Sequence, residues 1–104
     1  MLPVELEALV RDVVSQKCER QNVELKRAGQ GTPERLYDTL SSFSNQSGGG
    51  VIIFGVDEKD CFSITGVYDA QDLQAKVTAQ ALQMEPVVRP VFTVATIDGR
   101  TVVS

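Results

Sequence analysis

Apolar residues recur along the first part of the chain at helical spacing. Pro3 stands at the tolerated first turn, and Glu5 and Glu7 lie near the start, where the helix dipole favours acids. The pattern predicts an amphipathic opening helix that packs on a sheet, with a partner-binding role as the alternative. The expected apolar stripe is Leu6, Leu9, Val10, Val13 and Val14.

Two further segments have helical patterns with recognisable starts. Thr32-Pro33-Glu34 supplies a hydroxyl N-cap, a proline at the first helical position and an acid, and predicts a helix to about Asn45. Asp69 is expected to cap a helix from Ala70 to about Met84, ended by Pro86 and Pro90. Their inward residues are expected to be Leu36, Leu40 and Phe43, and then Leu73, Val77, Ala81 and Met84.

Extended patterns lie between and after these helices. Val23 and Leu25 alternate with polar residues, and the continuous apolar run Val51–Val56 predicts a strand covered on both faces. Further strands are expected at Phe62–Val67, at Val91–Ile97 and, after a two-residue Asp98-Gly99 turn, at Arg100–Val103. The order predicts one α/β (α+β) domain over residues 1–104, with a mixed β-sheet packed by two main helices and a short N-terminal helix.

Three glycines, Gly48 to Gly50, separate the second helix from the apolar strand. Glycine permits positive φ and close approach of other atoms. Two interpretations follow, a helix C-cap with close packing or a contact to phosphate or ribose. The ends of the apolar strand are therefore where we expect the domain to act.

Composition narrows the chemistry. The 104 residues include no histidine, which excludes a histidine base, a Ser-His-Asp or Cys-His nucleophile and the usual zinc ligand sets. Carboxylates remain as metal ligands, which favours Mg²⁺ or Mn²⁺. Cys18 and Cys61 form no CxxC pair and fit a reducing, cytoplasmic setting. No apolar run approaches transmembrane length, so we expect no membrane partner.

Charge is unevenly distributed. The net charge of −4 argues against binding of nucleic acid by the overall field. Five cations nevertheless fall within nineteen positions, which predicts a positive field on one side of the molecule. The alternative is an ordinary mixed-charge surface. They are Lys17, Arg20, Lys26, Arg27 and Arg35.

Several segments together resemble a known family. They are Glu19 to Lys26, Phe43 to Gly49, Val51 to Glu58 with its Gly-Val-Asp-Glu end, and Ile64 to Val67. In this order and spacing they resemble the Schlafen/AlbA-like DNA-binding domain, also called the divergent AAA domain, from about Glu19 to Val103. Two departures are Leu25 in place of a frequent aromatic residue and Gln46-Ser47 in place of Thr-x before the glycines.

The resemblance implies a nucleic-acid-binding domain at the N-terminus of a longer bacterial transcriptional regulator. An excised domain also fits a chain that stops within its last expected strand. Lys26 and Arg27 are the expected phosphate contacts, since exposed cations supply most non-specific affinity. The rest of the expected binding set is Arg35, Asn45, Gly48 and Gly49. Asn45 has the alternative role of a helix-end cap.

Animal Schlafen proteins imply a second function, cleavage of structured RNA at three carboxylates with a divalent metal. The matching residues are Glu19, Glu24 and Asp57, which would hold Mg²⁺ or Mn²⁺ if the strands bring them together. The alternatives are a Glu24 paired with Lys26 or Arg35 and an Asp57 that serves a turn. This metal-dependent endoribonuclease is the enzyme that the residues leave open.

A third function is a protein-interaction or dimerisation module. The acidic total, the amphipathic first helix and an exposed edge strand at Arg100–Val103 would serve association, including a homodimer. ATP binding has no support, because no GxxxxGK[ST] sequence is present and no lysine follows the glycines.

Overall fold

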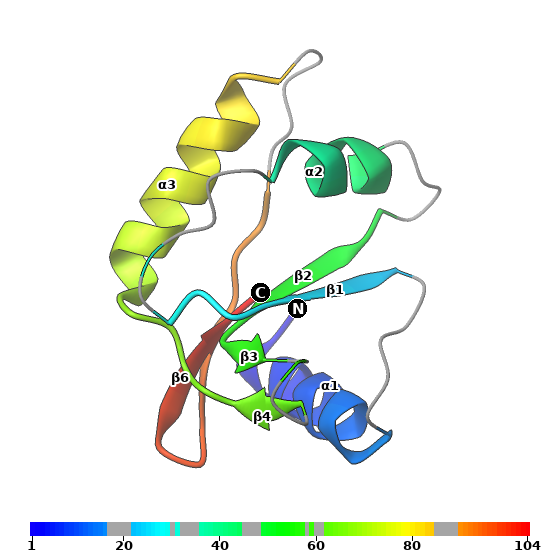
Figure 1. The fold of residues 1–104 in the computed structure, drawn as a ribbon, viewed down its shortest axis with the longest axis vertical. Coiled ribbons are helices and arrows are strands. Elements are labelled where there is room, and N and C mark those ends of the chain that lie inside the picture. Colours follow the sequence, from blue (N-terminus) through cyan, green and yellow to red (C-terminus); the bar gives the residue numbers. More distant parts are fainter. Residues whose placement is uncertain are drawn as a thin grey trace.

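A four-stranded mixed sheet organises the computed structural model, which describes residues 1–16, 22–29, 31, 36–44, 49–57, 59, 62–84 and 90–104 (Figure 1). Its strand order is β1-β2-β6-β5, with β1 parallel to β2 and the other neighbours antiparallel. A separate ribbon pairs β3 with β4. The elements are α1 (Pro3–Gln16), β1 (Val23–Lys26), α2 (Tyr37–Ser44), β2 (Val51–Phe54), β3 (Val56–Asp57), β4 (Ser63–Ile64), α3 (Ala70–Leu82), β5 (Val94–Ile97) and β6 (Arg100–Val103).

Helices cover both faces of this sheet, which confirms the predicted α+β class. Leu6, Val10 and Val13 of α1 pack with Ile53 on one face, while α2 and α3 pack over Phe54 on the other. Figure 1 shows α1 on the opposite side of the sheet from α2 and α3. Because Ile53 and Phe54 are neighbours on a strand, their side chains point to opposite faces, and both are fully buried. The expectation of a strand covered on both faces is therefore confirmed.

Helix α1 extends over 14 residues, which is longer than the short opening helix that we predicted. The backbone N–H of Leu2 donates to Oε1 of Glu5 at 2.8 Å, which satisfies a donor at the helix start. Arg11 lies near carboxylates of Glu7, on the same helix, and of Asp98, in the β5–β6 turn. These bonds, led by that to Asp98, raise the pKa of Arg11.

Each of the other two helices differs from its predicted range at one end. α2 begins at Tyr37, later than predicted. The N–H of Leu36, just before it, donates to Oε1 of Gln80 on α3 at 3.2 Å. Thr32 to Arg35 lie outside the described residues. Asp69 caps α3 as predicted, accepting from the amides of Gln71 and Asp72. α3 ends at Leu82, two residues early, although Met84 is buried as expected.

The predicted strand Val51–Val56 is divided at Gly55. Its φ is +108°, and a Cβ there would lie 3.3 Å from Cα of Gly66 and from the carbonyl oxygen of Thr101. The Gly55 carbonyl accepts the amides of Thr65 and Gly66 at 2.8 and 3.0 Å. The chain therefore leaves the main sheet at this glycine and continues as β3.

Three strand predictions need correction. The return strand Phe62–Val67 is reduced to β4, and Val91–Ile97 is reduced to β5. The strand predicted at Arg100–Val103 is present with these bounds as β6, but its predicted position at an edge is wrong. β6 lies between β2 and β5, and the edges of the four-stranded sheet are β1 and β5. The turn before β6 is as predicted, with φ of +52° at Asp98 and +79° at Gly99. No helix among the described residues has the length and apolar character needed to cross a membrane.

Replacement of Gly55 by alanine is expected to destabilise the protein by about 3–4 kcal/mol, because it adds a contact with two backbone segments to the strain of positive φ. Gly99→Ala is the matched control, since Gly99 also has positive φ but nothing within 4 Å of its added Cβ. It should cost only about 1–2 kcal/mol. Urea unfolding of both variants measures the difference, and equal losses would show that the crossing at Gly55 is not tight.

Candidate functional site

The carboxyl ends of β1 and β2 lie side by side. The two strands are parallel, Lys26 is paired with Phe54, and the N–H of Gly55 donates to the carbonyl of Lys26 at 2.8 Å. The residues that follow each strand therefore meet at one end of the sheet, the carboxyl end of β1 and β2, where ligands often bind in open α/β sheets. Lys26, Arg27 and Asp57 of the predicted site are brought together here.

Arg27 and Asp57 face each other at this end of the sheet. Nε of Arg27 lies 3.8 Å from Oδ2 of Asp57, and the side chain of Arg27 is 64% exposed against 17% for Asp57. The other oxygen of Asp57 accepts the N–H of Lys59 at 3.0 Å, as in an Asx turn. Asp57 thus has the turn role weighed from the sequence, while the guanidinium of Arg27 remains open to solvent.

Glu24 and Lys26 share one face of β1. Val23 and Leu25 are buried, so alternation leaves Glu24 and Lys26 on the other face, with Nζ of Lys26 3.7 Å from Oε1 of Glu24. Of the two partners considered for Glu24, the structure places Lys26 beside it. Arg35 lies outside the described residues.

The predicted carboxylate triad is only partly described. Glu19 lies outside the described residues, and the described part of the chain contains no group of three His, Cys, Asp or Glu that could hold a metal ion. Glu24 and Asp57 each have a cation within 4 Å. These two carboxylates do not form a metal site by themselves, and the triad stays a prediction that depends on Glu19.

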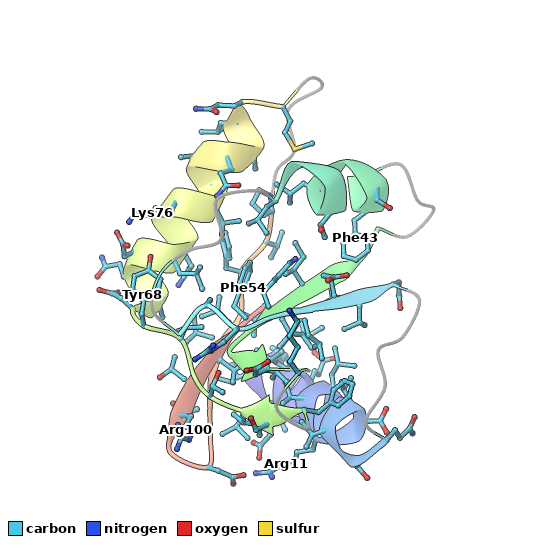
Figure 2. All side chains as sticks on the ribbon, viewed as in Figure 1. Arg11, Phe43, Phe54, Tyr68, Lys76 and Arg100 are labelled. Carbon is cyan, nitrogen blue, oxygen red and sulfur yellow. The ribbon has the colours of Figure 1, made fainter. Side chains whose placement is uncertain are left out.

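Arg100 lies at the same end of the sheet, and the sequence did not predict it as a site residue. Its Nη1 donates to the carbonyl of Thr65 at 3.2 Å, and a Cβ on Gly66 would lie 3.3 Å from its Cβ. A Cβ on Gly29 would lie 3.9 Å from the carbonyl oxygen of Gly66 and 4.0 Å from Nε of Arg27. Figure 2 labels Arg100 near the β5–β6 turn. We call Arg27, Gly29, Gly66 and Arg100 the arginine strip.

No local signal in the sequence marks Arg100 as part of this site. It follows an Asp-Gly turn, which predicts a hairpin but not what lies beside the hairpin. Its proximity to the β1 end arises only because Gly66 passes between them.

Tyr68, just before α3, links the loop that follows Arg27 to this helix. The N–H of Tyr68 donates to the carbonyl of Ala28 at 3.0 Å, and Ala28 itself has a φ of +48°. The hydroxyl of Tyr68 donates to Oδ2 of Asp72, which also lies 3.1 Å from Nζ of Lys76 (Figure 2). The bond from Tyr68, followed by that from Lys76, lowers the pKa of Asp72, and Asp72 raises the pKa of Lys76.

The glycines lie at the other end of β2. Gly49 has a φ of +68°, and a Cβ on Gly50 would lie 2.4 Å from the ring of Phe43. This contact supports the close-packing interpretation. Gly50 and Gly55 lie five residue steps apart along β2, roughly 16 Å of extended chain, so Gly49 is not beside Lys26 and Arg27. Asn45 and Gly48 lie outside the described residues.

Comparison with known proteins gives one family. The family model described as Schlafen, AlbA_2 matches residues 19–104, which is most of the chain. No curated protein and no solved structure gives a significant match.

The packing role of Gly50 predicts a specific coupling with Phe43. Gly50→Ala should cost about 1–3 kcal/mol in the native chain and little in a Phe43→Ala background, because the added methyl group then has no ring to meet. Gly31→Ala is the control, since nothing lies within 4 Å of its added Cβ. The double-mutant cycle is measured by urea unfolding. A Gly50→Ala cost that persists without the ring would contradict the packing role.

Loss of Tyr68's hydroxyl should change the titration of Asp72. A carboxyl whose pKa is lowered by folding stabilises the protein at pH values above its ordinary pKa, which for Asp72 is 3.8. This stabilisation is lost as the pH falls through the lowered pKa. In Tyr68→Phe the pKa of Asp72 should rise toward 3.8, as followed by NMR of the carboxyl carbon. Unchanged titration in this variant would show that Tyr68 does not donate to Asp72 in solution.

Proposed function

Because the chain belongs to the Schlafen, AlbA_2 family, we propose that it is the nucleic-acid-binding part of a transcriptional regulator and contacts phosphates at the arginine strip. Lys26 lies at the same end of the sheet and adds a third cation. The contact is to the sugar-phosphate backbone, which carries no base sequence and is common to DNA and RNA.

The observation that supports this proposal is the glycine contact between two arginines. Gly29 and Gly66 have no side chains, so the segments that carry Arg27 and Arg100 approach each other at their backbones, which places both arginines at one end of the sheet. Arginine is suited to this task because its planar guanidinium donates two parallel hydrogen bonds to phosphate oxygens.

Ion pairing distinguishes the two strip arginines from Arg11 and Lys76. Arg11 lies beside Glu7 and Asp98, and Lys76 lies beside Asp72 at 3.1 Å. Arg27 has only a longer contact of 3.8 Å to Asp57, and Arg100 donates to a neutral carbonyl. Of these four cations, Arg27 and Arg100 are therefore the two whose charge is least offset. Local charge of this kind can act although the whole chain has a net charge of −4.

Removal of both strip arginines is the direct test. Arg27→Ala/Arg100→Ala should weaken binding to labelled duplex DNA and hairpin RNA at low salt, and should reduce the slope of log K against log salt by about 2, one unit for each phosphate contact. Fluorescence anisotropy across a salt series, with Mn²⁺ present and absent, measures both quantities.

Lys76→Ala is the control, because it removes a cation that is already paired with Asp72. Equal binding by the double variant and this control would contradict the proposal. RNA fragments that appear only with Mn²⁺, and disappear in Glu24→Gln, would instead favour the carboxylate nuclease.

A further inference from the structure

A cavity of about 370 Å³ lies between the first half of β2 and the residues that precede β5. Leu40 and Phe43 of α2 and Val77 of α3 line it from the helices, and Ser104 lines it at the end of β6. Figure 1 shows the C-terminus close to β2 and to the orange segment that precedes β5. The other lining residues are Met1, Gly49, Gly50, Val51, Ile52, Phe54, Pro90, Val91, Phe92 and Thr93.

One wall of this cavity is an edge of β2 without a partner among the described residues. β2 pairs with β1 over all four residues but with β6 only at Phe54, opposite Val103. The amides of Val51 and Gly55 donate to β1, so by alternation the N–H and C=O of Ile52 face the other way, toward the cavity.

The opposite wall has the same property. Thr93 and Ser104 exchange both backbone hydrogen bonds, at 3.3 and 2.9 Å. Alternation then directs the N–H and C=O of Val91 to the same edge. Val91 is 83% exposed, and no backbone hydrogen bond to another described residue is present for it.

The pairing registers of β6 with β2 and with β5 define the position of one further strand between the two walls, which we call the track. Because Phe54 lies opposite Val103 and pairing is antiparallel, Ile52 faces the position one residue beyond Ser104. Because Val94 also lies opposite Val103, Val91 faces the position two residues beyond Ser104. A strand that continues β6 would therefore bond alternately to both walls.

We propose that the cavity is the seat of an extended segment that continues β6 past Ser104 in a longer polypeptide. Val103 packs on the face covered by α2 and α3, so the side chain two positions later points to that face, toward Leu40 and Phe43. The apolar lining therefore favours an apolar residue directly after Ser104, and the pairing on both walls favours a β-forming segment of three residues or more. A separate peptide fits less well, since the track starts at Ser104, which is already hydrogen-bonded in the sheet.

Such a continuation of β6 does not depend on the proposed function, and it has a spatial consequence. β6 begins at the arginine strip and runs antiparallel to β2, so its continuation leaves the sheet at the Gly50 end. The remainder of a longer protein would then start at the opposite end of the sheet from Arg27 and Arg100, and the strip would stay accessible.

The test appends Val-Thr-Val after Ser104 and compares it with an appended Ser-Pro-Ser of equal length. Val-Thr-Val should raise Tm by about 5 °C, a shift of the size expected for a small domain that gains a few backbone and apolar contacts. It should also slow hydrogen exchange of the Ile52 and Val91 amides at least tenfold, as measured by NMR.

Val91→Pro tests the predicted register. The gain from Val-Thr-Val should shrink in this background, measured against Val91→Pro without the extension, because proline has no N–H to donate. Equal Tm and equal amide exchange for the two extensions would overturn the proposal. A Tm gain that depends on protein concentration and accompanies a doubled mass would also overturn it, in favour of a second copy at this edge.

Discussion

The close approach of Gly55 to Gly66 and Thr101 is the contact on which the arrangement of the described residues depends. Three chain segments meet here at backbone distance, and the carbonyl of Gly55 accepts two amides from the returning segment. The N–H of Val67 then donates to the carbonyl of Thr101 at 2.9 Å, which ties this segment to β6. A side chain at either glycine would force these segments apart.

The candidate interface follows from this crossing. Once the chain turns out of the sheet at Gly55, it carries Asp57 to the end of β1, where Arg27 lies within 3.8 Å of it. The return through Gly66 places Arg100 on the other side of the same contact. A protein with an acidic total thus presents two arginines with glycine backbone between them, and a nucleic-acid backbone responds to such local charge within a Debye length of about 10 Å.

Strand lengths show how far local patterns extend. The alternation at Val91–Ile97 predicted one strand, but β5 comprises only Val94–Ile97, with one further backbone pair between Thr93 and Ser104. The apolar run at Val51–Val56 likewise predicted one strand where the structure has two, because the positive φ of Gly55 redirects it. A strand ends where its partner ends, and the partner is distant in sequence.

The sequence by itself determined the elements whose causes are local. Helical spacing identified the buried stripe of α1, the carboxylate of Asp69 marked the start of α3, and Asp98-Gly99 specified the hairpin. It also predicted Lys26 and Arg27 as candidate phosphate contacts, because residue type and position suffice for that. Only the tertiary structure decided that β6 is internal and that Arg100 lies beside the end of β1. Both depend on pairing between segments far apart in the chain, which no local periodicity records.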